Sequence, residues 1–156
     1  MAIVALVFVA GALLLEFFVV LGGAINGSIV NQTWFLEADT SGISGASSLT
    51  HWTLWNACPV SSDGLNTVCS VAPAYPFDPQ SNFGSQDGVP GSFIGTNKFY
   101  YETRFMFAFA LISLVFSAAS FLLGGLALCS RIGSYLSSVF ALAALIFQAA
   151  TAALMT

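Results

Sequence analysis

The chain has 156 residues, of which 57% are hydrophobic and 6% are charged, with a net charge of -4 and a mean hydropathy of +0.87. Soluble domains average about 25% charged residues, so the composition excludes a soluble globular protein. Three basic residues cannot form the positive face that nucleic-acid binding needs, and three cysteines are too few for a disulfide scaffold.

An apolar run opens the chain, and we assign residues 1–24 to a first transmembrane helix, since about 20 apolar residues cross a bilayer. The alternative is a signal peptide, whose apolar region of roughly 7–15 residues follows a basic segment. This run is longer and lacks such a segment, which favours a retained span. Glu16 is the ionisable residue within this run. It is either an ion or proton site, or a protonated or hydrogen-bonded carboxyl that faces the bundle, toward Gln148 or a serine.

The next segment, residues 25–103, is polar and rich in small residues, which predicts a loop. Disulfides persist in oxidising compartments, so Cys58 and Cys69 predict an extracellular loop closed by one bridge. In a chain-entropy estimate, a bridge around a loop of about 15 residues is worth roughly 3 kcal/mol. Metal binding by this pair is disfavoured because no further ligands flank it. Asn31 and Asn26 begin glycosylation sequons, with chance occurrence as the alternative.

Short β-prone stretches within this loop predict a small antiparallel sheet with glycines at the turns. They lie at residues 28–30, 33–36, 49–57 and 67–72. Residues 73–97 are rich in Pro, Gly, Ser and Asn, which predicts an irregular excursion. We expect Trp34, Trp55 and the disulfide to form the core of the loop, and His51 to be a loop residue stacked near Trp52.

Two further apolar runs predict a helical hairpin, with transmembrane helix 2 at residues 104–129 and transmembrane helix 3 at residues 134–156. The turn between them, residues 130–133, contains Arg131, and the positive-inside rule places this turn in the cytoplasm. The large loop then lies outside the cell. Cys129 is a juxtamembrane cysteine, for which we consider palmitoylation and a free thiol.

Small and polar residues recur at three- and four-residue steps along these two runs. They are Ser113, Ser117, Ser120 and Gly124 in the first, and Ser137, Ala141, Ala144 and Gln148 in the second. Small faces let helices approach closely in lipid, so we expect packing within the bundle, with an oligomer interface as the alternative. No ladder of charged residues, the usual mark of a transport route, follows either run.

Catalytic motifs are absent from the sequence. His51 with Asp39 or Asp63 and a serine has the composition of a hydrolase triad, but the G-x-S-x-G motif is missing, and a triad is recognised by geometry. Phosphate loops, metal clusters and dinucleotide fingerprints are missing as well. We therefore expect a protein that is not an enzyme and needs no metal or cofactor. A bound lipid or sterol is the one ligand that the sequence does not exclude.

Two motifs resemble known families. A tryptophan, a Leu-Trp pair and two cysteines resemble the claudin signature, with an arginine opening the second span; these are Trp34, Leu54, Trp55, Cys58, Cys69 and Arg104. Thr53 stands where claudins carry a glycine. A second set resembles the outer loop of the fungal Sur-seven/PalI family; it comprises Phe35, Leu36, Ala38, Asp39, Thr40, Gly42, Gly45 and Trp52.

The resemblance implies a mainly α membrane protein, a claudin-like bundle of transmembrane helices with a small extracellular antiparallel β-sheet cap. Family members have four spans, so we expect three here and a fourth after residue 156. The implied function is a non-enzymatic structural or organising role in fungal plasma-membrane domains, the eisosomes, linked to endocytosis, cell-wall integrity and sphingolipid balance. Expected partners are membrane lipids and a homo-oligomer or lateral assembly with other plasma-membrane proteins. The alternatives are an auxiliary subunit of a pump, channel or wall synthase, and a component of PalI-type pH signalling.

Overall fold

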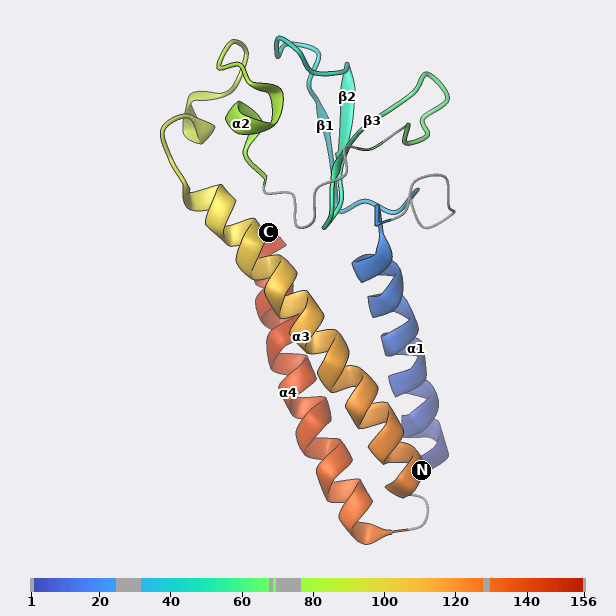
Figure 1. Ribbon diagram of the computed structural model, residues 1–156. Coiled ribbons are helices and arrows are strands. Elements are labelled where there is room, and N and C mark those ends of the chain that lie inside the picture. Colours follow the sequence, from blue (N-terminus) through green and yellow to red (C-terminus); the bar gives the residue numbers. More distant parts are fainter. Residues whose placement is uncertain (1, 25–31, 68, 70–76, 128–129, 156) are drawn as a thin grey trace. The chain divides into compact units, whose positions relative to one another are not determined.

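The computed structural model describes residues 2–24, 32–67, 69, 77–127 and 130–155. The chain forms two compact units. The helix unit comprises Met1–Val20 and Met106–Thr156, and the loop unit comprises Leu21–Phe105. In chain order the elements are α1 (Ala2–Leu21), β1 (Leu36–Asp39), β2 (Leu49–Trp52), β3 (Ala57–Pro59), α2 (Pro79–Phe83), η2 (Gly91–Phe93), α3 (Lys98–Ala127) and α4 (Arg131–Met155) (Figure 1).

Within the described residues, three helices are long and apolar enough to cross a membrane. They correspond to α1, α3 and α4, and the 20 residues of α1 extend for about 30 Å, the thickness of a bilayer core. All three are rich in residues that favour helices, such as Ala and Leu. The expected mainly α membrane class is confirmed.

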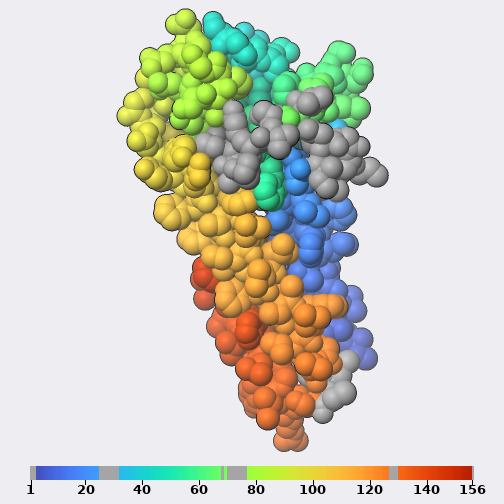
Figure 2. Space-filling model, viewed as in Figure 1, coloured from blue at the N-terminus to red at the C-terminus, as the bar shows by residue number. Residues whose placement is uncertain are grey.

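The helix unit has large apolar side chains outside and small ones inside. Phe8, Leu122 and Leu145 are exposed, and Figure 2 shows the surface that α1, α3 and α4 present on the face in view. Apart from Val20 and Met106, the buried positions are small or polar, among them Ala110, Ser113, Ser120, Ala144 and Thr151. Lipid solvates large apolar side chains as well as a core does, so close packing of small faces holds such a bundle together.

Two helices begin earlier than the apolar runs. α3 begins at Lys98 because Tyr101 N donates to Asn97 O at 3.1 Å and the Lys98–Glu102 ion pair, at 3.6 Å, spans one helical turn. α4 begins at Arg131, where the hydroxyl of Ser130 accepts a hydrogen bond from the Gly133 amide at 3.1 Å and caps the helix. Apolarity marks the stretch inside the bilayer, whereas hydrogen bonds and caps decide where a helix starts.

The loop unit contains the expected small antiparallel sheet, with strand order β1-β2-β3. Residues 49–57 form two strands rather than one stretch, because residues 53–56 make a tight turn between β2 and β3. β1 starts at Leu36, where the 33–36 stretch was expected to end. The expected stretch at 28–30 and most of the one at 67–72 lie outside the described residues, and Thr67 and Cys69 are not in strands.

Residues 73–97 were expected to be irregular, but the described part of this segment contains two short helices, α2 and η2. Asp78 caps α2 by accepting a hydrogen bond from the Ser81 amide at 3.4 Å, and Pro79 occupies the first turn. Gly84 ends the helix with a φ of 67°, in the left-handed region. Proline and glycine therefore mark the two ends of a helix here. In the sequence, the same residues had indicated a segment without helices.

The aromatic core of the loop unit is Trp52 rather than Trp34 and Trp55. Trp52 is 2% exposed and meets Phe77 and Phe83 edge-on, with ring centroids 5.2 and 6.2 Å apart. Trp34 is 40% exposed and Trp55 is half-buried in the β2–β3 turn. The expected core was therefore wrong for both tryptophans, because the second half of the loop brings its phenylalanines to β2.

Candidate functional site

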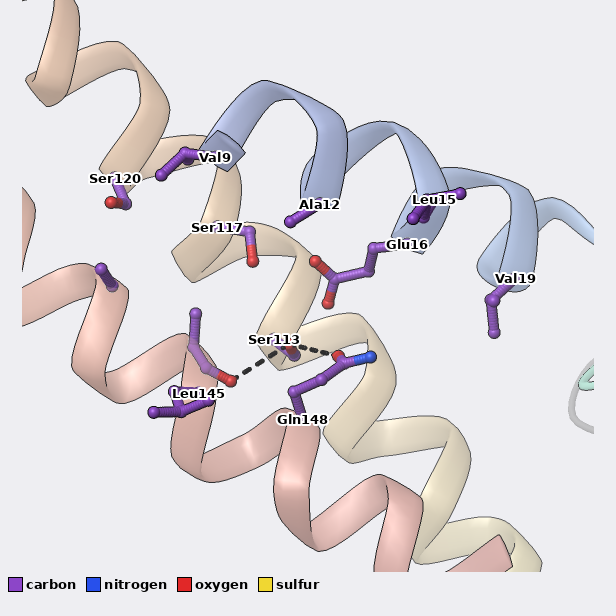
Figure 3. Close-up of a pocket in the computed structure, with 12 residues that line it drawn as sticks. Val9, Ala12, Leu15, Glu16, Val19, Ser113, Ser117, Ser120, Leu145 and Gln148 are labelled. Carbon is purple, nitrogen blue, oxygen red and sulfur yellow. Dashed lines mark hydrogen bonds between the residues drawn. The ribbon is translucent and has the colours of Figure 1, made fainter. Parts of the chain in front are cut away.

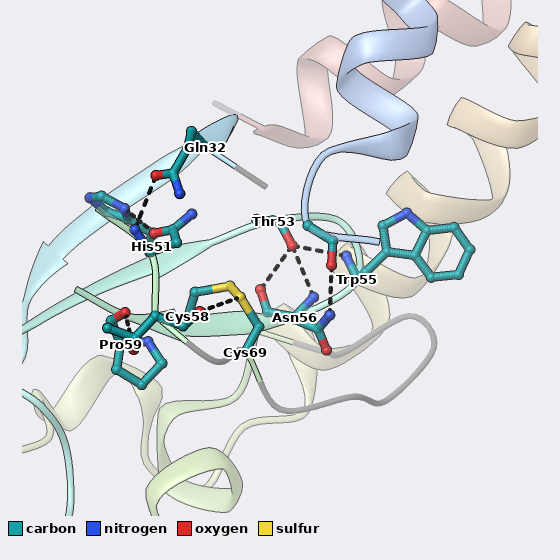
Figure 4. Close-up of a disulfide and its surroundings, with 11 residues drawn as sticks. Gln32, His51, Thr53, Trp55, Asn56, Cys58, Pro59 and Cys69 are labelled. Carbon is teal, nitrogen blue, oxygen red and sulfur yellow. Dashed lines mark hydrogen bonds between the residues drawn. A yellow bond between two sulfur atoms is a disulfide. The ribbon is translucent and has the colours of Figure 1, made fainter. Parts of the chain in front are cut away.

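The predicted disulfide joins β3 to the segment after the sheet. Cys58 and Cys69 are both buried, their Cα atoms are 4.4 Å apart, and the sulfurs are bonded (Figure 4). An isolated bridge between Val60 and Asn66 brackets the same hairpin-like excursion. The disulfide prediction is confirmed, and the bridge joins two cysteines that are 11 positions apart in the sequence.

The Leu-Trp pair of the claudin-like motif lies in the turn between β2 and β3. Leu54 is buried, and the hydroxyl of Thr53 accepts hydrogen bonds from the amides of Trp55 and Asn56 at 3.2 and 3.0 Å (Figure 4). The Thr53 amide donates to Asn56 O at 2.8 Å. The threonine that replaces the claudin glycine therefore supplies the hydroxyl that organises this turn.

The turn is also tied to the residues that follow α1. The side-chain amide of Asn56 donates to Gly23 O at 2.8 Å. Gly23 has a φ of 76°, and a Cβ at this position would collide with the side chain of Thr53. Sequence reasoning missed both Gly23 and Asn56; the only signal was an asparagine directly after the Leu-Trp pair.

His51 lies on β2 and not in a loop, which corrects the expected placement. Its ring is 1% exposed and stacks on Trp34, with centroids 3.8 Å apart and planes inclined by 12°. Nε2 lies 2.7 Å from a carboxylate oxygen of Glu37, and Nδ1 lies 2.6 Å from the side-chain oxygen of Asn66. Both ring nitrogens thus face side-chain oxygens of Glu37 and Asn66, and these two residues occupy the positions that a triad would need for its acid and its serine.

The loop residues shared with the Sur-seven/PalI pattern build the first two strands and their connection. Phe35 N donates to Trp52 O at 3.0 Å, and Leu36, Ala38 and Asp39 lie in register with residues 49–52. The buried Thr40 hydroxyl donates to Ser47 O at 2.7 Å and lies 2.8 Å from the Thr50 hydroxyl.

Asp39 closes the end of β1. One carboxylate oxygen accepts a hydrogen bond from the Ser41 amide at 2.9 Å. Hydrogen bonds from the Ser41 side chain and amide favour the ionised carboxylate and lower the pKa of Asp39 below its usual value. The carboxylate is exposed, so this interaction shapes a turn and makes no buried charge.

Two glycines of the same pattern, Gly42 and Gly45, lie against the end of α2 and the segment that follows it. A Cβ on Gly88 would collide with Gly42 O, and a Cβ on Gly45 would lie 3.2 Å from Phe83 O. Gly45 has a φ of 90° and Gly88 has a φ of 82°. Gly45 of the pattern and Gly88 outside it therefore permit a close approach of two backbones, whereas a Cβ on Gly42 itself would meet open space.

The small-residue stripes lie where α3 and α4 meet. Ser120 and Ser137 exchange hydrogen bonds, each hydroxyl donating to the other's backbone oxygen, at 3.0 and 2.9 Å. The Ser113 hydroxyl lies 2.8 Å from the side-chain oxygen of Gln148 and 3.3 Å from Ala144 O. A Cβ on Gly124 would lie 3.1 Å from the Leu6 side chain, so this glycine faces α1.

A mostly apolar pocket of about 390 Å³ with a few polar side chains lies between α1, α3 and α4 (Figure 3). Glu16, Ser117 and Gln148 contribute its polar atoms, together with Ser113 and Ser120. Ala141, a further stripe residue, lines this pocket and a second one of about 270 Å³. The structure thus brings Glu16 and Gln148 to one cavity, as the sequence predicted for a carboxyl facing the bundle.

Of the other expected site residues, Arg104 lies in the first turns of α3. Arg104 lies over the Tyr100 ring, with the guanidinium carbon 5.0 Å from the centroid. Asn26, Asn31 and Cys129 lie outside the described residues. Within the described part of the chain, no cluster of three or more His, Cys, Asp and Glu side chains is placed to hold a metal ion.

Comparisons with known proteins agree with this architecture. The SUR7/PalI family model matches residues 1–156. Protein SUR7 of Saccharomyces cerevisiae is 38% identical over 156 residues, which are 99% of this chain and 52% of the relative. Protein SUR7 of Candida albicans is 39% identical over 153 residues, 97% of this chain and 56% of that protein. The plasma membrane protein YNL194C of S. cerevisiae is 42% identical over 114 residues, 71% of this chain and 38% of its own length.

This chain spans about half the length of the SUR7 proteins that it matches. No solved structure matches it significantly. The membrane-spanning helices and the relative named as a plasma membrane protein support a multi-pass plasma-membrane location. The match over the full sequence, with a helical membrane unit and a small disulfide-closed sheet, shows that the chain belongs to the SUR7/PalI family.

Proposed function

We propose that this chain is a non-enzymatic structural protein that organises domains of the fungal plasma membrane. One observation carries the proposal: the residues of the family pattern build the sheet and its turns. Thr40 bonds within the β1–β2 connection, Gly45 permits a close approach to the backbone of Phe83, and Trp52 fills the core. Residues used in this way stabilise a surface, and a stable surface is what an organising protein presents to its neighbours.

The domains in question are eisosomes, and the proposed role links the protein to endocytosis, cell-wall integrity and sphingolipid balance. The loop unit lies outside the cell and the turn beside Arg131 lies in the cytoplasm. The protein acts through membrane lipids and through a homo-oligomer or lateral assembly with other plasma-membrane proteins. Exposed large apolar side chains on α1, such as Phe8 and Leu15, support lateral contact within the membrane.

Imaging of the full-length protein in living fungal cells tests this proposal. A fluorescent fusion should collect in stable cortical patches, and deletion of the gene should change the number or shape of these patches. The Cys58→Ala and Cys69→Ala variants lack the disulfide, and their fluorescence in the patches should be weaker than that of the wild type. An evenly spread wild-type fusion, with unchanged patches after deletion, contradicts the organising role.

The second candidate is an auxiliary subunit of a larger membrane machine, such as a pump, channel or wall synthase. The observation that favours it is the outer face of α1, where Val4, Phe8 and Leu15 are exposed. A partner helix fits such a face as well as lipid does. A catalytic protein that co-purifies in fixed ratio, and loses activity when this chain is deleted, supports the second candidate over the first.

A further inference from the structure

The first two turns of α3 carry two of the chain's three basic residues. They are Lys98 and Arg104, and the third, Arg131, begins α4. Arg104 directly precedes the apolar part of α3, which contains no charged residue from Phe105 to Ala127. Because charged side chains are costly inside a bilayer, Arg104 marks the level at which α3 enters the headgroup region. A residue at this level contacts lipid headgroups if it faces outward.

Arg104 is exposed and lies on the outward face of α3, a single continuous helix (Figure 1). Ser113 follows it by nine residues, about two and a half helical turns, so Ser113 lies on the opposite face. Ser113 is fully buried and lines the pocket that α1 and α4 form with α3. Leu122 follows Arg104 by 18 residues, about five turns, and is 68% exposed. A further span packed between α1 and α4 would therefore leave the face of Arg104 open.

The Arg104 side chain extends towards the loop end of the helix. Its guanidinium carbon lies 5.0 Å from the centroid of the Tyr100 ring, and Tyr100 is one turn earlier in α3. Side chains of a helix tilt towards its N-terminus, so the helix geometry directs the guanidinium away from the apolar part. A long basic side chain in this position keeps its stem in the apolar phase and its charge among the headgroups.

No carboxylate of the described chain neutralises Arg104. One ion pair of the described residues joins Lys98 to Glu102 at 3.6 Å, and the other joins His51 to Glu37. Glu102 lies two residues before Arg104, which places it about 200° away around the helix. The residues outside the described ranges include no Asp or Glu. The guanidinium N–H donors therefore remain for a ligand.

Tyr101 and Phe105 complete the surface around Arg104. Both rings are 56% exposed, and residues four apart share one side of a helix. Tyr101 is three residues from both Lys98 and Arg104, and its ring meets that of Tyr100 edge-on, with centroids 5.4 Å apart. Tyrosine is enriched at the membrane–water interface because its ring suits the apolar side and its hydroxyl the polar side. A phenol and a guanidinium are thus neighbours on the surface of α3.

We propose that Arg104 and Tyr101 bind the phosphate group of an anionic membrane lipid, in the leaflet on the side of the loop unit. A guanidinium holds two phosphate oxygens through parallel hydrogen bonds, and the phenol hydroxyl donates a third bond. The lipid chains lie beside Phe105 along the outward face of α3. Because Lys98 is paired with Glu102, one positive charge remains, which matches one phosphate. A zwitterionic lipid carries its own cation beside the phosphate and fits this charge less well.

The phosphate comes from the bilayer rather than from the solution. The chain has a net charge of -4, so its overall field does not concentrate free anions. A lipid headgroup is already held at the level of Arg104 by its own hydrocarbon chains and needs no long-range attraction. This inference concerns lipid binding alone and does not depend on the organising role.

Photoactivatable, clickable lipid analogues test the proposal with the purified full-length protein in phosphatidylcholine vesicles. Separate arms use a phosphatidic acid probe, a phosphatidylcholine probe and a ceramide probe, which has no phosphate, and mass spectrometry identifies the labelled peptides. The phosphatidic acid probe should label residues 98–112 about fivefold more than the phosphatidylcholine probe, the effect of one basic residue at a membrane surface. The ceramide probe should label this peptide least. Excess inorganic phosphate should not compete.

Variants of two exposed arginines locate the site. Arg104→Gln removes the charge and should abolish the preference for the phosphatidic acid probe at residues 98–112. Arg104→Lys keeps the charge without the two parallel hydrogen bonds and should retain part of the preference. Tyr101→Phe removes one donor and should lower the preference as well. Arg131→Gln is the matched control, because it removes an exposed arginine at the start of α4, and it should leave this preference unchanged.

Three results overturn the proposal. The first is equal labelling of residues 98–112 by the phosphatidic acid and phosphatidylcholine probes, and the second is a preference that Arg104→Gln leaves unchanged. The third is competition by inorganic phosphate, which would make this a site for a soluble anion. Gel filtration and thermal unfolding of each variant separate a lost site from a lost fold, and Arg104→Lys and Tyr101→Phe keep the test decisive if Arg104→Gln fails to fold. Cortical patches that form normally with Arg104→Gln would leave the organising role intact, so the two proposals can fail separately.

Discussion

Trp34 stacks on His51 with ring centroids 3.8 Å apart, although Trp34 precedes β1 and His51 lies in β2. The same histidine contacts Glu37 on β1 and Asn66 beyond β3. One buried ring therefore connects the first strand, the central strand and the segment that leads to Cys69. The loop unit is held on this side by polar contacts and on the other by the aromatic cluster around Trp52.

Replacing His51 with Phe keeps a ring beside Trp34 and removes both hydrogen bonds. The buried Asn66 then loses its contact to the ring, so we expect the free energy of unfolding to fall by about 1–3 kcal/mol. Thermal unfolding of the purified full-length protein, followed by tryptophan fluorescence, measures the change. Lys98→Ala, which breaks an exposed ion pair, is the control and should shift stability by less than about 1 kcal/mol. Equal stability of His51→Phe and wild type contradicts the role given to His51.

Gly23→Ala should destabilise the loop unit, because the new Cβ meets the Thr53 side chain and the residue has a positive φ. We expect a loss above about 1 kcal/mol, since alanine is strained at such a position. Gly11→Ala is the matched control: it lies in α1 with open space around it, and should be neutral or stabilising by about 0.5–1 kcal/mol. Melting temperatures of the two variants compare them directly, and the same value for both is the contrary result.

A glycine pair in α3 tests the packing of the bundle. A side chain on Gly124 meets Leu6 and Ser137, whereas Gly125 has open space. We expect Gly124→Leu to separate the helices and cost about 1–3 kcal/mol through overpacking. Gly125→Leu should be tolerated. Detergent stability by gel filtration distinguishes them, and a tolerated Gly124→Leu would place the stripe outside the bundle contact.

The pH dependence of the loop unit should reflect Asp39. Hydrogen bonds from Ser41 lower the pKa of this carboxyl in the folded protein, so its stabilising contribution is complete above the ordinary value of 3.8. The contribution disappears as the pH falls through the lowered folded-state pKa. Asp39→Asn should therefore melt below wild type at neutral pH, and the difference should shrink below pH 3.8. A difference that stays constant down to pH 2 contradicts this origin.

The disulfide should be needed for delivery to the cell surface. Cys58→Ser leaves Cys69 unpaired and removes a bridge worth roughly 3 kcal/mol, by analogy with loops of about 15 residues. We expect the variant to be retained in the secretory pathway, as seen by fluorescence microscopy of a tagged full-length protein. Cys129→Ser, which leaves the bridge intact, serves as the control. Normal surface delivery of Cys58→Ser speaks against a folding role for the bridge.

Features of the structure that depend on composition could be predicted from the sequence. The three apolar runs gave three membrane helices, and Cys58 and Cys69 gave the disulfide, because bilayer thickness and redox compartment act on residue type alone. Glu16 and Gln148 could be assigned to the same side of the bundle because both are polar residues in apolar helices, and such residues usually face the bundle interior.

Features that depend on strand register could not be predicted. A shift of one residue reverses which side chains face the core, so the sequence did not show that Trp52 of β2 is buried while Trp34, before β1, is exposed. His51 contacts Glu37, 14 positions away, through the register of β1 and β2, and Asn66, 15 positions away, through the chain beyond β3; no local pattern specifies either contact. α2 was not predicted because Asp78 and Pro79 also occur in ordinary turns. They act as a helix start only when the residues after them adopt helical backbone angles.

The central claim, that this chain organises membrane domains by lateral assembly, is tested most directly by affinity purification of the full-length protein in mild detergent. The mass of the particle and the identity of every co-purifying protein are measured together. Our account predicts an assembly made of copies of the chain and of cortical scaffold proteins. A monomeric particle, or one enzyme or pump in fixed ratio to the chain, would contradict it.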